Sequence, residues 1–210
     1  MGTDQDDAGH GRWASVYGRV LDALEDLLAG IDPATEHGGV PATPDWTVRQ
    51  VVAHLAGTAS DITTGRMAGA PGSVWTARQL AERDGVPVAE LLAELRSTQR
   101  SFGVIAEGAS AGVFNAVVHH ADLTEALGAP RQDEALFLPV LQDQRHRWST
   151  LSLRLPHDPD LAGLRPVDPY LLSRALFTRL DRSAVRALVG PNPTDAEVDG
   201  LGLFGPPAYR

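Results

Sequence analysis

The chain contains no cysteine and no lysine among its 210 residues. Without cysteine there is no disulfide, no thiolate ligand for a metal and no cysteine nucleophile, so thiol chemistry would require a thiol from outside the protein. Any metal must then be bound by histidine, aspartate, glutamate or amide side chains. The 18 basic residues are all arginine, which excludes a Schiff-base mechanism and a lysine base.

Long apolar runs and basic clusters are missing as well. No run of about 18 apolar residues is present, and the start, MGTDQDDAGHGRW, is polar and acidic, unlike a secretory signal. We therefore predict a cytoplasmic protein that does not bind membranes. The formal net charge of -9 and the pI near 5.1 disfavour contact with phosphate backbones, and no stripe of clustered arginines offsets them. The expected partner is a small-molecule substrate, not a nucleic acid.

The dominant positive signal in the sequence is helical periodicity. A hydrophobic content of 43% and a charged content of 21% are ordinary for a globular protein, and the length suits one main core. Thr47 and Gln50 have the spacing of a capping box at a helix start. Only the stretch STLSLRL alternates like a strand. Helices are predicted over residues 13–31, 47–62, 76–85, 87–108, 111–127, 133–155 in part and 168–189. Such amphipathic helices with short connections predict an all-α fold, an antiparallel four-helix bundle.

Polar side chains on two of these helices form a candidate site. At about 100° per residue, Asn115, His119 and Asp122 share one stripe of their helix, while His54 borders the apolar face of an earlier helix. The functional interpretation is that His54 and His119 converge on one divalent metal, with Asn115 as the third ligand, because residues at i and i+4 can share an ion. Asp122 would then hold an imidazole N–H.

A structural interpretation fits the same spacing. Asn115, His119 and Asp122 would then form a solvated stripe. His120, which points into the edge of the apolar arc, would be a hydrogen-bonded core histidine. The periodicity alone leaves both interpretations open.

Four segments of the chain resemble the mycothiol-dependent maleylpyruvate isomerase branch of the DinB-like superfamily. They are PDWTVRQVVAHLAG, WTARQLAERDGVPVAELLAELRSTQ, VVHHADLTEALG and the ending DPYLLSRALFTRLDRSAVRAL with FGPPAYR. The resemblance implies a DinB-like four-helix bundle, expected over residues 1–156, and a short C-terminal extension, 157–210, packed on it. It also implies a zinc-type metal, Zn or Ni, held by one histidine and by a Glu-x-x-x-His pair, and mycothiol as the thiol. His54 and His119 match the two histidines.

One position and one five-residue run depart from the family pattern. Asn115 stands where the family has the ligand glutamate, and a neutral amide oxygen is a poorer zinc ligand than a carboxylate, so we expect weaker metal binding. In the tail, the run Phe177-Thr178-Arg179-Leu180-Asp181 replaces a Thr-Gly-Arg-Arg-Ser run and keeps only Arg179. We expect Arg179 and Arg182 to lie on a solvated helix face.

Two functions are compatible with this pattern. In the first, a metal on His54 and His119 activates a small-molecule thiol such as mycothiol for transfer or cis–trans isomerisation, with Asn115 as a weak ligand. In the second, the metal has been lost, and the bundle binds a small molecule or acts as an enzyme without it. His119, His120 or Asp122 would then do acid–base work. The substrate and the oligomeric state stay open, a homodimer being one option.

Overall fold

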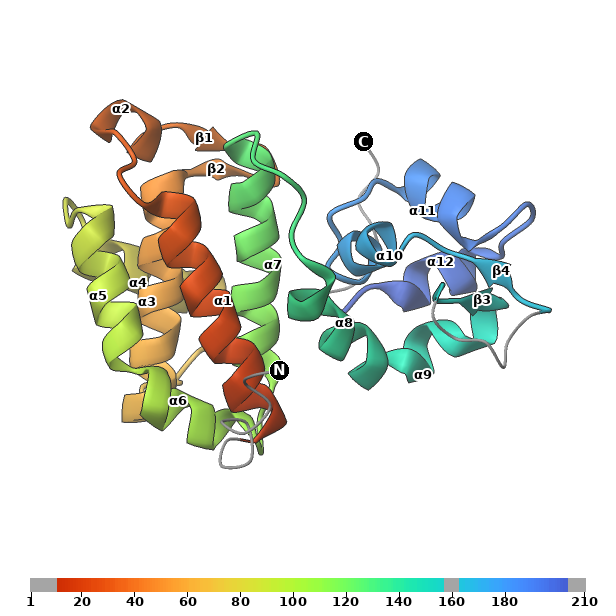
Figure 1. Ribbon diagram of the computed structural model, residues 1–210, viewed down its shortest axis with the longest axis horizontal. Coiled ribbons are helices and arrows are strands. Elements are labelled where there is room, and N and C mark those ends of the chain that lie inside the picture. The colour runs from red at the N-terminus through yellow and green to blue at the C-terminus, as the bar shows by residue number, and fades with distance from the viewer. Residues whose placement is uncertain (1–10, 157–162, 204–210) are drawn as a thin grey trace, which may run out of the picture. The chain divides into compact units, whose positions relative to one another are not determined.

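The computed structural model describes residues 11–156 and 163–203. The chain divides into two compact units, Met1–Gln132 and Asp133–Arg210 (Figure 1), each with its own buried core. Helices dominate both units and the strands are short. The predicted all-α fold is therefore confirmed.

Four helical segments build the bundle of the N-terminal unit. They are α1 (Arg12–Leu28), α3 (Val48–Thr64), the pair α5 (Val88–Ser97) and α6 (Gln99–Ala106), and α7 (Ala111–Ala126). Helices α1 and α3 each pack against α5, α6 and α7. Their apolar faces form a core in which Leu24, Val51, Leu91, Val113 and Val117 are fully buried. Burial of each such side chain stabilises the fold by about 1.5–3 kcal/mol.

The start of α3 is fixed by hydrogen bonds that the sequence predicts. The Thr47 hydroxyl accepts a hydrogen bond from the backbone N–H of Gln50, and the Gln50 side chain accepts one from the N–H of Thr47. This capping box satisfies two backbone donors near the start of the helix. At the other end, Gly65 has the left-handed φ of 75° that terminates the helix. His54 is thereby held near the middle of α3.

A short hairpin precedes α3. Helix α2 (Pro33–Glu36) leads into β1 (Gly39–Val40), which pairs antiparallel with β2 (Thr43–Thr47). The sequence predicts a loop here, because proline and glycine are unfavourable inside strands. The strands are accordingly only two and five residues long. Because β2 ends at the cap of α3, it places Trp46 beside the start of that helix.

Helix α4 (Ser73–Glu82) packs on α3. Gly57 of α3 permits the close approach, since a Cβ at this position would lie 2.7 Å from the Cβ of Gln79. Gln79 is fully buried as a result. Arg83, which follows α4, bonds to both carboxylate oxygens of Glu94 in α5, at 2.9 and 2.5 Å. α4 is thus tied to the bundle through packing on α3 and through this ion pair.

The C-terminal unit is a cluster of short helices with one small sheet. Strand β3 (Leu153–Arg154) lies within the STLSLRL stretch and pairs parallel with β4 (Arg165–Pro166). The elements in chain order are α8 (Glu134–Asp143), α9 (Arg145–Trp148), the 3-10 turn η2 (Ser149–Leu151), β3 (Leu153–Arg154), β4 (Arg165–Pro166), α10 (Pro169–Leu176), α11 (Arg182–Val189) and α12 (Asp195–Leu201).

The boundary between the two units lies after Gln132, whereas the sequence places it after residue 156. Helix α8 buries its apolar face against α10, where the rings of Phe137 and Tyr170 meet edge to face at 5.9 Å. Helix α9 packs on α12. The four bundle segments are complete without residues 134–155, which belong to the C-terminal unit. Packing of that unit on the bundle stays a prediction, and residues 157–162 and 204–210 lie outside the described ranges.

The helix predicted over residues 168–189 is interrupted. Between α10 and α11, Thr178 has a φ of 57°, a left-handed conformation that is costly for a β-branched residue and easy for glycine. In the run that the resemblance implies, glycine stands at this position. Arg182 does not lie on a solvated face, because it is 7% exposed and forms ion pairs with Asp195 and Asp199. That expectation is wrong for Arg182.

No single helix in the described ranges is long and apolar enough to cross a membrane. Helices α6 and α7 together would have the length and composition, but the chain bends by 119° between them. Most residues of α7 are buried within the N-terminal unit.

Candidate functional site

The bundle brings His54 of α3 and His119 of α7 side by side. Their ring centroids lie 5.3 Å apart with an interplanar angle of 84°. Their side chains are buried, with 6% and 5% of the residue surface exposed. Asn115, one turn before His119 on α7, is half-buried, and its Nδ2 lies 3.4 Å from Nε2 of His54. The three side chains that the sequence proposes as metal ligands therefore meet between two helices.

The tautomer of His54 is set by a buried amide. Gln79 Nε2 donates a hydrogen bond to Asp61 Oδ2 at 2.9 Å, so its Oε1 must be the acceptor for the bond of 2.9 Å to Nδ1 of His54. Asp61, which is 1% exposed, also accepts from Arg78 at 2.8 Å. His54 therefore carries its proton on Nδ1, and its Nε2 lone pair faces Asn115.

His119 is held in the same way by a carboxylate. Its Nδ1 lies 3.0 Å from Oδ2 of Asp122, which is fully buried. Because a carboxylate only accepts, Nδ1 of His119 is the donor and Nε2 is left without the proton when the ring is neutral. A histidine that donates one ring N–H to a carboxylate or amide oxygen and keeps the other nitrogen free is the usual arrangement of a metal ligand.

Burial and the neighbouring His119 lower the pKa of His54 to about 3. The hydrogen bonds with Gln79 and Asn115 act in the opposite direction and are smaller contributions. The His54 imidazole is therefore neutral near pH 7, which is the form that binds a metal.

The imidazoles of His54 and His119 are suitable ligands for a divalent metal, whereas the third candidate ligand, Asn115, is a weak one. In the described part of the chain, no group of three or more His, Cys, Asp or Glu side chains is arranged to hold a metal ion, so a third protein ligand would have to be the neutral amide of Asn115. With its Nδ2 toward His54, this amide donates to the Nε2 lone pair. A half-turn of the amide would put its oxygen in that place, where it could bind a metal.

Two tryptophans surround the histidine pair. The Trp46 ring lies 5.0 Å from the ring of His54 and 5.9 Å from that of His119. Trp75, near the start of α4, meets His54 edge to face at 6.1 Å. Trp75 is buried, whereas Trp46 and Asn115 are half-buried. The partly exposed side of the site is therefore the one formed by Trp46 and Asn115.

His120 has different neighbours from His119. Gln132 Nε2 donates to its Nδ1 at 2.9 Å and also bonds to the carbonyl of Val117 at 3.0 Å. A further hydrogen bond joins His120 to the backbone of Ala23 in α1, and burial lowers the pKa of His120 to about 4. His120 is thus a hydrogen-bonded core histidine, as the structural interpretation has it. A catalytic role for His120 stays a prediction, and none of these contacts supports it.

The solvated-stripe interpretation of α7 is wrong, because His119 and Asp122 are buried and Asn115 is half-buried. Sequence reasoning missed Gln79 and Trp46, which lie outside the predicted bundle helices. One signal for Gln79 was present in the sequence, since Gly57 inside a helix marks a position where another element can approach closely. Asp61 shares the stripe of His54, but its role depends on Gln79.

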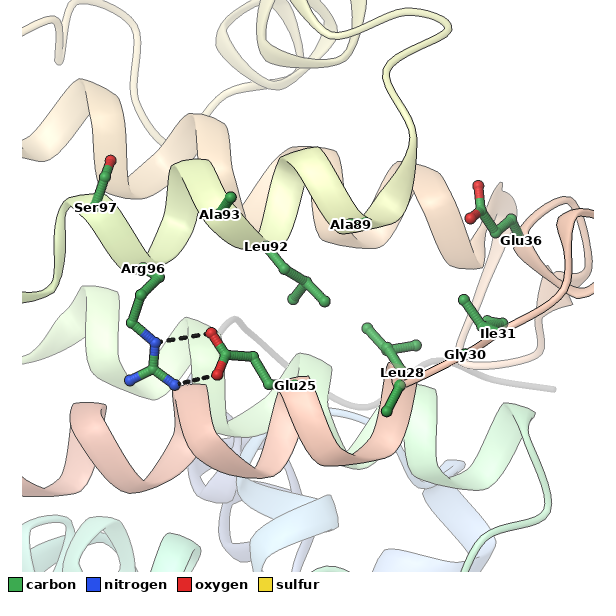
Figure 2. A pocket seen from close by; sticks show the side chains of 11 residues that line it. Glu25, Leu28, Gly30, Ile31, Glu36, Ala89, Leu92, Ala93, Arg96 and Ser97 are labelled. Carbon is green, nitrogen blue, oxygen red and sulfur yellow. Dashed lines mark hydrogen bonds and ion pairs between the residues drawn. The ribbon is translucent and has the colours of Figure 1, made fainter.

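A separate pocket of about 680 Å³ opens between α1 and α5 (Figure 2). Leu28, Ile31 and Leu92 line it, and Arg96 bonds to both oxygens of Glu25 at its side, at 2.8 and 2.6 Å. The histidine pair is not part of its lining. We therefore treat it as distinct from the candidate site.

One comparison with known proteins gives a match, and it covers part of the N-terminal unit. Residues 17–109 match the family model described as mycothiol maleylpyruvate isomerase N-terminal domain. No curated protein and no solved structure gives a significant match. The matched range holds most of α1, all of α3 to α6 and His54, and it ends before Asn115 and His119. Residues 17–109 of the N-terminal unit are thus similar to the mycothiol maleylpyruvate isomerase N-terminal domain, which belongs to the DinB-like superfamily.

Proposed function

We propose that this protein is a metal-assisted small-molecule enzyme that uses a thiol of the mycothiol type for group transfer or cis–trans isomerisation. The observation that carries the proposal is the pair of buried imidazoles whose Nδ1 atoms are both engaged, by Gln79 and by Asp122, so that the Nε2 atoms are the ones that a ligand can use. At His54 the ligand would displace the 3.4 Å contact with Asn115 Nδ2. The family match and the absence of cysteine are consistent with a thiol supplied from outside.

In this proposal His54 and His119 hold the metal and Asn115 is the third, weaker ligand. A bound divalent metal would lower the pKa of a thiol and so favour the nucleophilic thiolate. The chain itself orients the two imidazoles through Gln79 and Asp122. Trp46 shields the pair from water on its partly exposed side. Because the amide is neutral, we expect weaker binding than in a site with a glutamate ligand.

A second candidate function is a metal-free bundle that binds a small molecule or transforms it without metal. The observation that favours it is the 3.4 Å contact in which Asn115 Nδ2 faces the lone pair of His54 Nε2. With this amide orientation, a side-chain N–H occupies the direction that a metal would need. His119 and Asp122 would then be the residues available for acid–base work.

Metal titration separates the two candidates. Protein freed of metal with a chelator is titrated calorimetrically with Zn²⁺ and with Ni²⁺, for the wild type, the His54→Ala, His119→Ala double variant and Asn115→Glu. We expect the wild type to bind one ion, the double variant to bind none, and Asn115→Glu to bind at least about tenfold more tightly than the wild type, because a carboxylate replaces the amide.

The matched control is His146→Ala, which removes an exposed histidine of the C-terminal unit. It should bind the ion as the wild type does. If the wild type binds no ion more tightly than the double variant does, the metal-assisted function is wrong and the metal-free candidate replaces it. A thiol-transfer assay with Asn115→Glu then adds a second test, since tighter metal binding without thiol turnover would point to a repurposed cavity.

A further inference from the structure

Thr58 of α3 carries a buried hydroxyl without a hydrogen-bond partner. The residue is 6% exposed, and its Oγ1 bonds to no atom in the described part of the chain. Threonines inside helices usually bond back to a carbonyl one turn earlier. Thr63 and Thr64 of the same helix do so, with Oγ1 to carbonyl distances of 2.9 and 2.7 Å. A buried polar group without a partner is costly, so such a group in a native structure calls for an explanation.

The position of Thr58 on α3 directs it to the histidine site. At 3.6 residues per turn, Thr58 lies about 40° around the helix from His54 and about 60° from Asp61. Asp61 faces α4, because it bonds to Gln79. Ile62, about 40° to the other side of Thr58, faces α7, since its Cδ1 would lie 2.8 Å from a Cβ at Gly112. Thr58 therefore faces the seam between α4 and α7.

The level of Thr58 along the helix also fits the site. One turn earlier, His54 meets Asn115 of α7, and one turn later Ile62 lies opposite Gly112. Thr58 is therefore opposite the turn of α7 that runs from Gly112 to Asn115. The half-buried Asn115 belongs to the partly exposed side of the site. A small molecule that reaches the Nε2 atoms past Asn115 would pass within reach of the Thr58 hydroxyl.

The polar groups closest to this seam are already engaged. Asp61 accepts from Gln79 and Arg78, and Gln79 accepts from His54. These bonds hold the imidazole of His54 and leave the hydroxyl of Thr58 available. A hydroxyl can donate to a thiolate sulfur or to a carboxylate oxygen.

We propose that Thr58 is a ligand-contact residue whose hydroxyl donates a hydrogen bond to an anionic atom of the small molecule bound at His54 and His119. This inference rests on the proposed function, because it assumes a small-molecule thiol or its metal-free equivalent in that site. The anionic atom is the sulfur of the thiol or a carboxylate oxygen beside it. Thr58 thereby contributes to the choice of ligand as well as to its affinity.

The test compares Thr58→Val, which removes the hydroxyl and keeps the shape, with Thr58→Ser, which keeps the hydroxyl. The matched control is Thr63→Val, whose lost hydroxyl bonds only within its own helix. The probes are N-acetylcysteine and its sulfur-free analogue N-acetylalanine, titrated calorimetrically. We expect Thr58→Val to bind N-acetylcysteine about tenfold more weakly, the loss typical of one hydrogen bond to a charged group. Thr58→Ser and Thr63→Val should bind as the wild type does.

The two probes distinguish the anionic atom. A loss for both indicates a bond to the carboxylate, and a loss for N-acetylcysteine alone indicates a bond to the sulfur. Unchanged affinity of Thr58→Val for both probes, while the wild type binds, overturns the proposal and leaves the proposed function intact.

Thermal unfolding without ligand gives an independent measurement. If the hydroxyl has no partner in the free protein, Thr58→Val should unfold about 2–4 °C higher than the wild type, whereas Thr63→Val should not. A lower unfolding temperature for Thr58→Val would show that the hydroxyl is bonded within the protein, and would overturn the proposal. The unfolding temperatures show whether the Thr58 hydroxyl has a partner within the protein, even if the wild type binds neither probe. Failure of the wild type to bind either probe would count against the proposed function.

Discussion

His119 and His120 are neighbours in the chain and differ in what the fold does with their ring nitrogens. His119 uses one nitrogen to bond to Asp122, and its other nitrogen has no hydrogen bond to the described residues. The His119 ring lies 5.3 Å from that of His54. His120 uses both, through Gln132 and the backbone of Ala23. Both are buried to nearly the same extent, with 5% and 6% of their surface exposed.

Burial of a histidine therefore does not separate a binding residue from a structural one. The criterion is whether a nitrogen is left over once the protein's own hydrogen bonds are counted. In His120 none is left, so its imidazole ties α7 to α1 and to the chain after α7. In His119 one nitrogen is left, and in His54 the second nitrogen has only the 3.4 Å contact with Asn115.

The largest expected effect is that of His120→Ala on stability. The substitution leaves a cavity between α7 and α1 and removes the hydrogen bonds to Gln132 and Ala23. We expect the free energy of unfolding to fall by about 2–4 kcal/mol, measured by urea denaturation. The affinity for Zn²⁺ or Ni²⁺ should be unchanged where the protein is folded. His119→Ala is the matched variant, and it should abolish metal binding. Equal loss of metal affinity in both variants would contradict the distinction between His119 as a metal-site residue and His120 as a structural residue.

Gly57→Ala tests whether the metal site depends on the contact between α4 and α3 that places Gln79 beside His54. The added methyl group would lie 2.7 Å from the Cβ and 2.8 Å from the Cγ of Gln79, near the root of that side chain, so α4 must shift. We expect a loss of about 1–3 kcal/mol in the free energy of unfolding, together with weaker metal binding, because Gln79 holds His54. The control is Gly200→Ala in α12, where a Cβ would meet open space. Unchanged metal affinity in Gly57→Ala would show that the Gln79 bond does not orient His54.

The sequence predicts those features that are determined within a single helix. The capping box at Thr47, the spacing of Asn115 and His119, and the bundle itself follow from periodicity and capping rules. The bond between Gln79 and His54 depends on the approach of α4 to α3, which no spacing within either helix encodes. The break at Thr178 was also invisible, because a β-branched residue in a left-handed conformation gives no sequence signal. The unit boundary was misplaced because the apolar face of α8 does not reveal that its partner is α10.

Asp122→Asn probes the histidine that has a free nitrogen. The amide keeps the shape and an acceptor oxygen but removes the negative charge next to His119. Substitution of such a supporting residue typically reduces metal affinity by about 10–100-fold, and we expect a value near the lower end because the hydrogen bond can be kept. Calorimetric titration with Zn²⁺ provides the measurement. An affinity equal to that of the wild type would mean that the charge of Asp122 does not support the imidazole.

Gln132→Leu should have the smallest effect, although it removes a partner of His120. Gln132 Nε2 donates to His120 and to the carbonyl of Val117, whereas its buried Oε1 has no partner within the described residues. The substitution therefore loses two hydrogen bonds and also removes one unsatisfied oxygen, so the two effects partly offset. We expect a net loss of about 1 kcal/mol in the free energy of unfolding.

A double-mutant cycle with His120→Leu locates this loss. If Gln132 contributes mainly through His120, the double variant should be less destabilised than the sum of the two single variants, by about 0.5 kcal/mol or more. Strictly additive effects would place the contribution of Gln132 in its bond to Val117. In that case His120 would retain an unsatisfied nitrogen in the Gln132→Leu variant at little cost. The criterion that separates it from His119, the use of both ring nitrogens by the protein, would then lose its energetic basis.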